Sequence, residues 1–128
     1  TDDGDQKMKS RYYPHIDKAK VFGDHYVRDF SEHSRGVAVD VSLLYAKTGK
    51  PVDMGGHHDL LDPSSTTDST LVTPSQRRNR MILKTAFEKQ GFANYAPEWW
   101  HYRLLNEPEP TLHYYFPVWD GMTSAGRP

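Results

Sequence analysis

Two short stretches of the sequence contain residues that could carry out metal-assisted hydrolysis. Residues 31–40 hold His33 and Asp40, and residues 98–101 read Glu98-Trp99-Trp100-His101. Two imidazoles and a carboxylate form a donor set that zinc accepts, and three protein ligands leave the fourth zinc position for water. Zinc lowers the pKa of its bound water to about 7. The two stretches therefore predict a hydrolytic site with one zinc ion per chain.

Glu98 is the candidate general base beside this site. It stands three residues before His101, so a shared helical turn would place both side chains on one face. A carboxylate that is not itself a ligand could then take a proton from the metal-bound water. This spacing predicts that His101 binds the metal while Glu98 acts as the general base.

Each stretch taken alone also has a simpler interpretation. A single histidine near a single aspartate is commonly a surface pair or a satisfied core histidine, and the chain has 7 histidines. The Glu-Trp-Trp-His sequence equally fits an aromatic core stripe with polar edges. The combination of the two stretches is what favours a metal site.

A strand and a hairpin are expected to position the first stretch. The sequence alternates over residues 37–42, with Val37, Val39 and Val41 on one face and Asp40 on the other, and the strand is expected to extend over residues 37–45. This is the pattern of a strand that is buried on its valine side, so Asp40 would point away from the valines. Gly36 would allow a bend that turns His33 back to the metal. A turn signal at residues 47–50 predicts a hairpin whose second arm, residues 51–54, returns to the site.

A capping box predicts the start of the main helix. Thr73 and Gln76 would form this box around a proline, and the helix would end at Gly91. Its apolar stripe would consist of Ile82, Leu83, Ala86 and Phe87. The arginines at positions 77, 78 and 80 are interpreted as a solvated face or as partners for local carboxylates.

The remaining segments are interpreted from their composition. Residues 62–75 are rich in serine, threonine, aspartate and proline, and are expected to be a mobile loop or a lid over the site. Residues 15–22 are expected to form a short helix, residues 92–95 and 100–105 two strands, and residues 113–118 an edge strand.

The overall composition limits the classes of function. The chain has 128 residues, of which 26% are charged and 36% hydrophobic, and is interpreted as a single domain, residues 1–128. A net charge of -1 gives no reason to expect nucleic acid or an anionic membrane, and no stretch approaches a membrane span or a signal peptide. Because there are no cysteines, histidine and carboxylate are the plausible metal ligands. This composition is compatible with the cytoplasm and the periplasm alike.

The motifs resemble those of the zinc D-alanyl-D-alanine dipeptidases of the vancomycin-resistance type, within the D,D-carboxypeptidase and Hedgehog-like metallopeptidase group. The resemblance runs from about residue 5 to residue 118, in the order expected for the family. It rests on Lys9-Ser10-Arg11-Tyr12-Tyr13-Pro14, Ser31-x-His33-Ser34-Arg35-Gly36-x-Ala38-x-Asp40, Met54-Gly55, Asn79-Arg80, Gly91-Phe92 and Glu98-Trp99-Trp100-His101. It implies an α+β fold of the Hedgehog and D,D-peptidase kind, with a small antiparallel sheet and helices packed on one side.

The resemblance also implies a role for each site residue. His33, Asp40 and His101 would be the zinc ligands, and Glu98 would be the catalytic base. Ser31 would meet the substrate carboxylate. Asp59, which follows Met54-Gly55 at the family's spacing, would hold the free ammonium of the substrate.

The implied activity is zinc-dependent hydrolysis of the D-alanyl-D-alanine dipeptide in bacteria, in antibiotic resistance, cell-wall recycling or nutrient use. Anchoring of both substrate ends would restrict the enzyme to dipeptides. Without the Asp59 contact, the alternative is a D,D- or L,D-carboxypeptidase that acts on peptidoglycan stem peptides. An alternative of a different class is a zinc-binding recognition module without turnover.

One family motif is not present in this sequence. The family carries a Tyr-Arg-Pro motif well upstream of the Ser-x-His stretch, and its arginine stabilises the oxyanion; this sequence contains no such motif. The chain is therefore expected to be the C-terminal part of a longer catalytic domain, or to be impaired in activity. The expected macromolecular partner is the missing N-terminal segment or a second copy of the chain.

Overall fold

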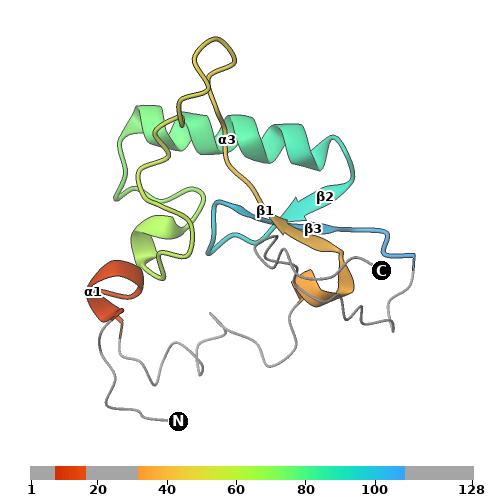
Figure 1. The fold of residues 1–128 in the computed structure, drawn as a ribbon, viewed down its shortest axis with the longest axis horizontal. Coiled ribbons are helices and arrows are strands. Elements are labelled where there is room, and N and C mark those ends of the chain that lie inside the picture. The colour runs from red at the N-terminus through yellow and green to blue at the C-terminus, as the bar shows by residue number, and fades with distance from the viewer. Residues whose placement is uncertain (1–7, 17–31, 109–128) are drawn as a thin grey trace, which may run out of the picture.

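The structure, a computed structural model, describes residues 8–16 and 32–108 (Figure 1). A small antiparallel sheet and one long helix dominate these residues, which confirms the expected α+β class. The elements in chain order are α1 (Lys9–Tyr12), η1 (Glu32–Arg35), β1 (Ala38–Asp40), η2 (Pro63–Ser65), α3 (Pro74–Glu88), β2 (Phe92–Asn94) and β3 (His101–Leu104).

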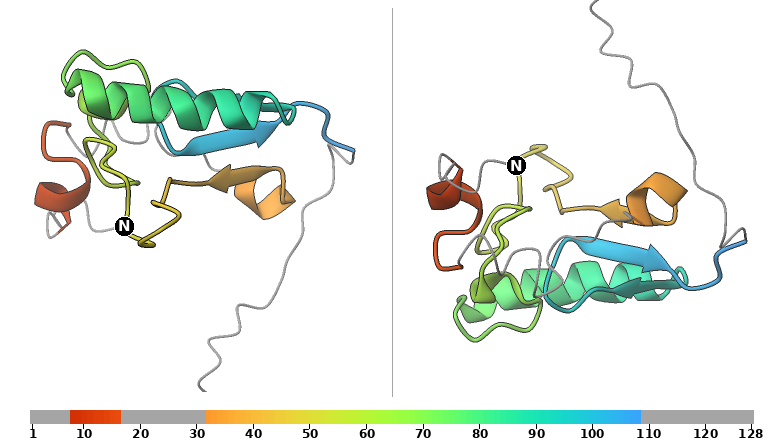
Figure 2. Two further views of the ribbon diagram at one scale, coloured as in Figure 1. Left: turned by 90° about the horizontal axis from the view of Figure 1, so that it is seen from above. Right: turned by 90° about the horizontal axis from the view of Figure 1, so that it is seen from below.

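The sheet brings the two chemically important stretches together. Its strand order is β1-β3-β2, and both strand pairs are antiparallel. In the β1–β3 pair, Asp40 lies directly opposite His101. Helix α3 lies along one side of the sheet in all views (Figures 1 and 2). Residues distant in sequence therefore meet because β3 is the central strand.

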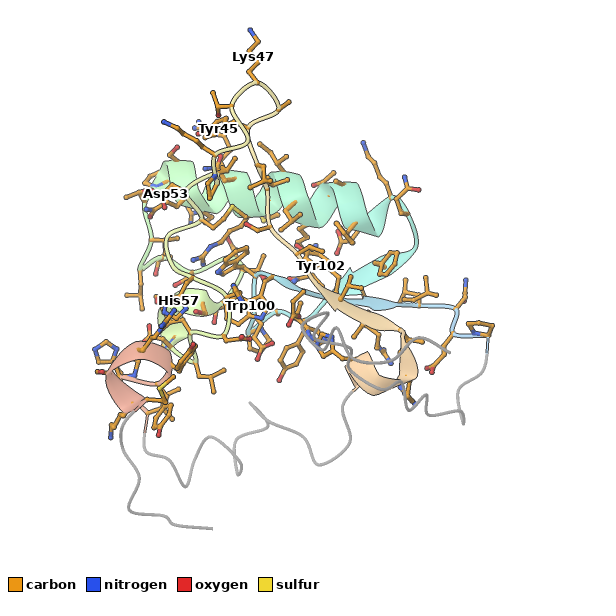
Figure 3. The ribbon with its side chains drawn as sticks, viewed as in Figure 1. Tyr45, Lys47, Asp53, His57, Trp100 and Tyr102 are labelled. Atoms are coloured by element: carbon orange, nitrogen blue, oxygen red, sulfur yellow. The ribbon has the colours of Figure 1, made fainter. Side chains whose placement is uncertain are left out.

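The hydrophobic core lies between α3 and the sheet. It consists of Met54, Leu83, Trp99, Trp100 and Tyr102. Figure 3 labels Trp100 and Tyr102. Phe87 of α3 packs against Tyr102 and Phe92, with ring centroids 4.7 and 5.4 Å apart. Two tryptophans next to the candidate base thus belong to the core, so the Glu-Trp-Trp-His sequence serves both the core and the candidate site.

Helix α3 begins where the capping box predicts. The Thr73 hydroxyl accepts a hydrogen bond from the Gln76 amide, and the Gln76 side chain accepts one from the Thr73 amide. The predicted apolar stripe is only half right, because Ile82 is 53% exposed whereas Leu83 is buried. The face turned to the rest of the protein is spaced at the helical period and consists of Gln76, Arg80, Leu83 and Phe87.

Arg80 is fully buried, so its interpretation as part of a solvated face is wrong. Its guanidinium donates hydrogen bonds to the carbonyls of Met54, Ser64 and Thr66 at 2.7–2.9 Å. It also lies over the Trp99 ring, 5.8 Å from the centroid. Burial lowers the pKa of this group to about 10, and the charge of Asp53 opposes that shift. By contrast, Arg77 does pair with a local carboxylate, that of Asp68, at 3.9 Å.

Residues 62–75 are irregular apart from η2 and the start of α3, as expected for a loop, but several of their polar side chains are buried. Asp62, Ser65 and Thr67 are buried. The Ser65 hydroxyl donates to the Leu60 carbonyl at 2.6 Å, and the Asp62 carboxylate accepts from the Ser64 amide at 2.9 Å. The small polar side chains are tolerated inside because they find hydrogen-bond partners there.

Strand β1 is shorter than the predicted strand over residues 37–45, and its valine face is covered only in part. Val37 is buried but Val39 is 37% exposed. β1 is an edge strand, whereas α3 packs over β2 at the opposite edge, which leaves Val39 partly uncovered. The predicted hairpin is reduced to one bridge, between Leu44 and Pro51. The second arm of the predicted hairpin runs to α3 rather than directly to the site. Arg80 of α3 donates a hydrogen bond to the Met54 carbonyl there.

The predicted helix over residues 15–22 is not borne out where it can be compared. α1 lies earlier, at Lys9–Tyr12, and residues 14–16 form a turn. Residues 17–22, the predicted strand at 113–118 and Ser31 lie outside the described residues. Among the helices of the described part of the chain, none has the length and apolarity that a membrane crossing requires.

Candidate metal centre

Three short elements place the candidate metal ligands. Asp40 ends β1, His101 begins β3, and the antiparallel pairing sets them side by side. His33 lies in η1, which is followed by Gly36 with a φ of 70°. Glycine adopts this left-handed backbone without strain, so the chain can turn from η1 into β1. The bend predicted at Gly36 is present, and it brings His33 over Asp40.

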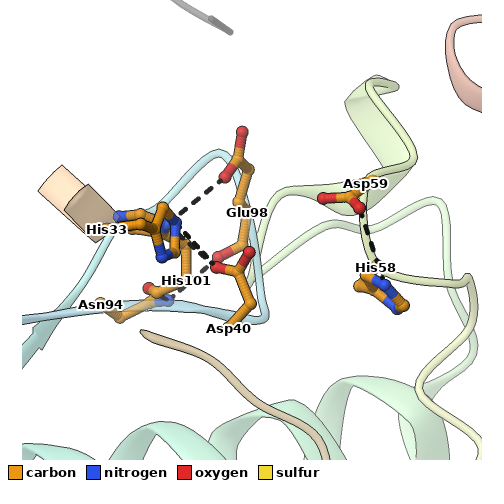
Figure 4. A network of polar contacts seen from close by, with 7 residues as sticks. All are labelled: His33, Asp40, His58, Asp59, Asn94, Glu98 and His101. Carbon is orange, nitrogen blue, oxygen red and sulfur yellow. Dashed lines mark hydrogen bonds and ion pairs between the residues drawn. The ribbon is translucent and has the colours of Figure 1, made fainter. Parts of the chain in front are cut away.

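The three candidate ligands converge on one point (Figure 4). His33 Nε2 lies 3.5 Å and His101 Nδ1 3.1 Å from the same carboxylate oxygen of Asp40. The two imidazole rings are nearly perpendicular, with centroids 4.9 Å apart. One ligand atom from each residue lies within 4.8 Å of the other two. The structure therefore brings His33, Asp40 and His101 together as the sequence analysis predicts.

This donor set fits a divalent metal ion. Imidazole nitrogen and carboxylate oxygen are ordinary zinc ligands, and two neutral histidines with one aspartate leave a net positive charge on the metal. The His33 side chain is 41% exposed and that of His101 15% exposed, so the cluster opens to solvent on the His33 side. Three ligands with one open side leave room for water or substrate.

Glu98 lies beside the cluster, in the turn expected between the strands near residues 92–95 and 100–105. The Glu98 amide donates to the Tyr95 carbonyl at 2.9 Å, and the His101 amide donates to the Glu98 carbonyl at 3.2 Å. Glu98 Oε2 comes within 3.9 Å of His101 Nδ1. The spacing of three residues therefore places both side chains together, as predicted, through a single turn of the backbone.

The surroundings of Glu98 favour its protonated form. Burial raises the pKa of Glu98 to about 7, His101 opposes this shift, and the negative charges of Asp40 and Asp59 add to it. A cation held by the neighbouring ligands would lower this pKa again, because it stabilises the carboxylate. The carboxyl group is thus suited to exchange a proton near neutral pH.

Asp59 lies on a separate loop beside the cluster (Figure 4). Its backbone is left-handed, with a φ of 62°, and its exposed carboxylate lies 3.6 Å from His58 Nε2. Aspartate tolerates this conformation better than most residues. Its charge acts on Glu98, although the two carboxylates belong to different segments. The structure thus places Asp59 near the site but outside the ligand cluster.

Asn94 and Thr67 contact the site but were missed by the sequence analysis. Asn94 donates to the carbonyls of Glu98 and His101, and Thr67 donates to the Asn94 side chain. Asparagine is disfavoured in strands, so its position at the end of a predicted strand was a usable signal. The polar composition around Thr67 gave none.

The fold and the cluster together define a class of protein. A small antiparallel sheet that joins two histidines and an aspartate beside a partly buried glutamate is the arrangement of a metallopeptidase domain. The chain belongs to the peptidase M15 family, described as D-ala-D-ala dipeptidase, whose family model matches residues 3–119.

Individual relatives agree with this family assignment. The chain is 44% identical to the D-alanyl-D-alanine dipeptidase of Streptomyces coelicolor over 114 residues, which are 89% of this chain and 56% of that protein. It is 39% identical to that of Enterococcus faecium over 110 residues, with 86% and 54% covered. It is 37% identical to that of Enterococcus faecalis over 114 residues, with 89% and 56% covered. The chain spans about half the length of these curated relatives.

Proposed function

We propose that this protein hydrolyses the D-alanyl-D-alanine dipeptide with one zinc ion held by His33, Asp40 and His101. The convergence of these three ligand atoms within 4.8 Å of one another, beside the partly buried carboxyl group of Glu98, is the observation that carries the proposal. The names of the relatives support the choice of substrate. Such a substrate belongs to bacterial cell-wall metabolism, and the reaction would take place in the cytoplasm or the periplasm.

Zinc, when bound, would acidify the attacking water and polarise the scissile carbonyl. Glu98 Oε2 accepts the proton of the attacking water and later delivers it to the leaving amine. Burial raises the pKa of Glu98, which favours uptake of the proton of the water, whereas a cation held by the ligands would lower this pKa, which favours release of the proton to the amine. The Trp99 and Trp100 side chains behind the turn are buried, so the base is backed by a packed core.

Recognition of the two substrate ends would give dipeptide specificity. The exposed Asp59 carboxylate pairs with the free ammonium of the substrate, and Ser31, outside the described residues, meets its free carboxylate. A longer peptide lacks the ammonium at this distance, so it would leave Asp59 without that partner.

Release of D-alanine tests the proposal. The zinc-loaded protein is expected to hydrolyse D-alanyl-D-alanine, to lose activity with a chelator and to regain it with zinc. The N-acylated dipeptide is expected to be a much poorer substrate. Efficient hydrolysis of the acylated dipeptide would instead support the carboxypeptidase alternative, and zinc binding without hydrolysis of either would support the recognition module.

A further inference from the structure

We propose that Asn94, held by Thr67, is a positioning residue that fixes the turn carrying Glu98 and His101. The catalytic consequence of this role rests on the proposed function. The structural role does not, since it concerns the geometry of the turn itself. Neither residue belongs to the ligand cluster: Asn94 binds the backbone of the turn, and Thr67 orients the Asn94 side chain.

Asn94 connects the end of β2 to the turn that follows it (Figure 4). Its side-chain nitrogen donates to the carbonyls of Glu98 and His101, both at 3.1 Å. These carbonyls belong to the two residues whose side chains form the catalytic half of the site. One amide group therefore ties the candidate base to a candidate metal ligand.

Thr67 sets the orientation of the Asn94 amide. The Thr67 hydroxyl donates to the Asn94 side-chain oxygen at 2.6 Å, and Thr67 is only 3% exposed. The Thr67 amide also donates to the Ala96 carbonyl at 2.9 Å, within the same turn. A reversed Asn94 amide would place its oxygen against two carbonyl oxygens, which cannot donate. Thr67 and the turn thus specify one orientation of the side chain.

The Asn94 amide supplies part of the hydrogen bonding that closes the turn over residues 95–101. The Glu98 carbonyl also accepts from the His101 amide at 3.2 Å, and the His101 carbonyl also accepts from the Tyr95 amide at 3.0 Å. Without Asn94, each carbonyl would keep one of these two bonds, and the turn could widen. A displacement of about 1 Å in a catalytic group can reduce the rate about 100-fold.

The contacts of Asn94 are separate from those that hold α3 on the sheet. Phe87 packs against Tyr102 and Phe92 on the α3 side, whereas the Asn94 side chain bonds to Thr67, Glu98 and His101. Loss of the Asn94 amide should therefore loosen the turn more than the core. Phe87→Leu offers a control that weakens the core without touching the turn.

The test compares Asn94→Ala, Thr67→Val, Thr67→Ser and Phe87→Leu with the wild type. Thr67→Val keeps the shape of the side chain but removes the donor, whereas Thr67→Ser restores the hydroxyl. The measurements are kcat and KM for D-alanyl-D-alanine, zinc affinity by chelator competition, and amide hydrogen exchange of residues 95–101 in the metal-free protein.

Asn94→Ala is expected to lower kcat and zinc affinity by about 10- to 100-fold, the range typical of groups that orient metal ligands. KM should change little, because Asp59 lies on another loop. In this variant the amides of Glu98 and His101 should exchange faster than in the wild type, and their increase should exceed that of the amides in the sheet. Thr67→Val should show a smaller form of the same effects, and Thr67→Ser should behave like the wild type.

The inference is overturned if Asn94→Ala leaves both the zinc affinity and the hydrogen exchange of the turn unchanged. It is also overturned if Asn94→Ala and Phe87→Leu, at an equal loss of melting temperature, change zinc affinity and exchange equally. If Asn94→Ala does not fold, the contrast between Thr67→Val and Thr67→Ser decides the question. If the wild type does not hydrolyse the dipeptide, the proposed function fails, while zinc affinity and exchange still test the inference.

Discussion

At the scale of single residues, Glu98 combines a site role with a cost to the fold. Its pKa is raised from 4.5 to about 7, mainly by burial, so the folded metal-free protein binds a proton that the unfolded chain has released over this pH range. Stability should therefore fall as the pH rises from the unfolded towards the folded pKa of Glu98. A functional carboxyl group is kept here at the expense of stability.

Glu98→Gln should consequently stabilise the metal-free protein above neutral pH, by about 1–3 kcal/mol. At a pH below 4.5, where the carboxyl group is protonated in both states, the gain should vanish. Urea denaturation in the presence of a chelator measures both values. Glu88→Gln is the control, since Glu88 is exposed and pairs with Lys84 on α3. An equal effect of Glu98→Gln at both pH values would contradict the burial argument.

Asp59 is predicted to recognise the substrate ammonium. Asp59→Asn should raise KM for D-alanyl-D-alanine by about 10- to 100-fold, as expected for loss of a charged hydrogen bond, with a smaller change in kcat. Hydrolysis of the N-acylated dipeptide should be unaffected. Steady-state kinetics with both substrates measure this, and Asp68→Asn is a control on a neighbouring loop. An unchanged KM would remove Asp59 from the site.

At the scale of elements, α3 acts as the support for the loop that leads to Asp59. Gln76 and Asn79 donate to the side chain and the carbonyl of Asp53, at 2.9 and 2.8 Å, and Arg80 holds Met54. Hydrogen bonding by Gln76 and Gly55 lowers the pKa of Asp53. The loop then passes Gly55, whose φ is 81°. Its path is thus set by the helix before it reaches the site.

Two glycines allow a matched test of this support. A Cβ at Gly55 would lie 2.9 Å from both Gln76 Oε1 and Val72 Cγ1, whereas a Cβ at Gly49, with a φ of 65°, would meet nothing within 4 Å. Gly49→Ala should cost about 1–2 kcal/mol for the left-handed backbone alone. Gly55→Ala should cost more, because contact is added to the same strain. Equal denaturation midpoints for the two variants would show that the loop does not pack on α3 as described.

The elements also show which features a sequence can predict. Capping of α3 and the strands near residues 92–95 and 100–105 were predictable because their signals are local. The burial of Arg80 was not, since its carbonyl partners at Met54, Ser64 and Thr66 are remote in sequence. The packing of residues 62–69 was missed for the same reason, because polar composition indicates exposure unless the partners are known.

At the scale of the whole molecule, the sheet order brings together what the chain separates. The candidate ligands were predictable from residue type, spacing and family resemblance, and the structure places them in one cluster. The supports of the cluster depend on contacts across the fold, so the sequence marks Asn94 only as unusual in a strand and does not mark Thr67 at all. The expected association with an upstream segment or a second copy stays a prediction, for a chain that spans about half the length of its relatives.

The most direct test of the central claim is D-alanine release from D-alanyl-D-alanine by the zinc-loaded wild type and by Glu98→Gln, with the zinc content of both measured. The wild type should turn over, and the variant should keep its zinc but lose activity by about 100-fold or more. Turnover by the variant at the wild-type rate would contradict the role of Glu98 as the base. Tight zinc binding by a wild type that releases no D-alanine would contradict the dipeptidase itself.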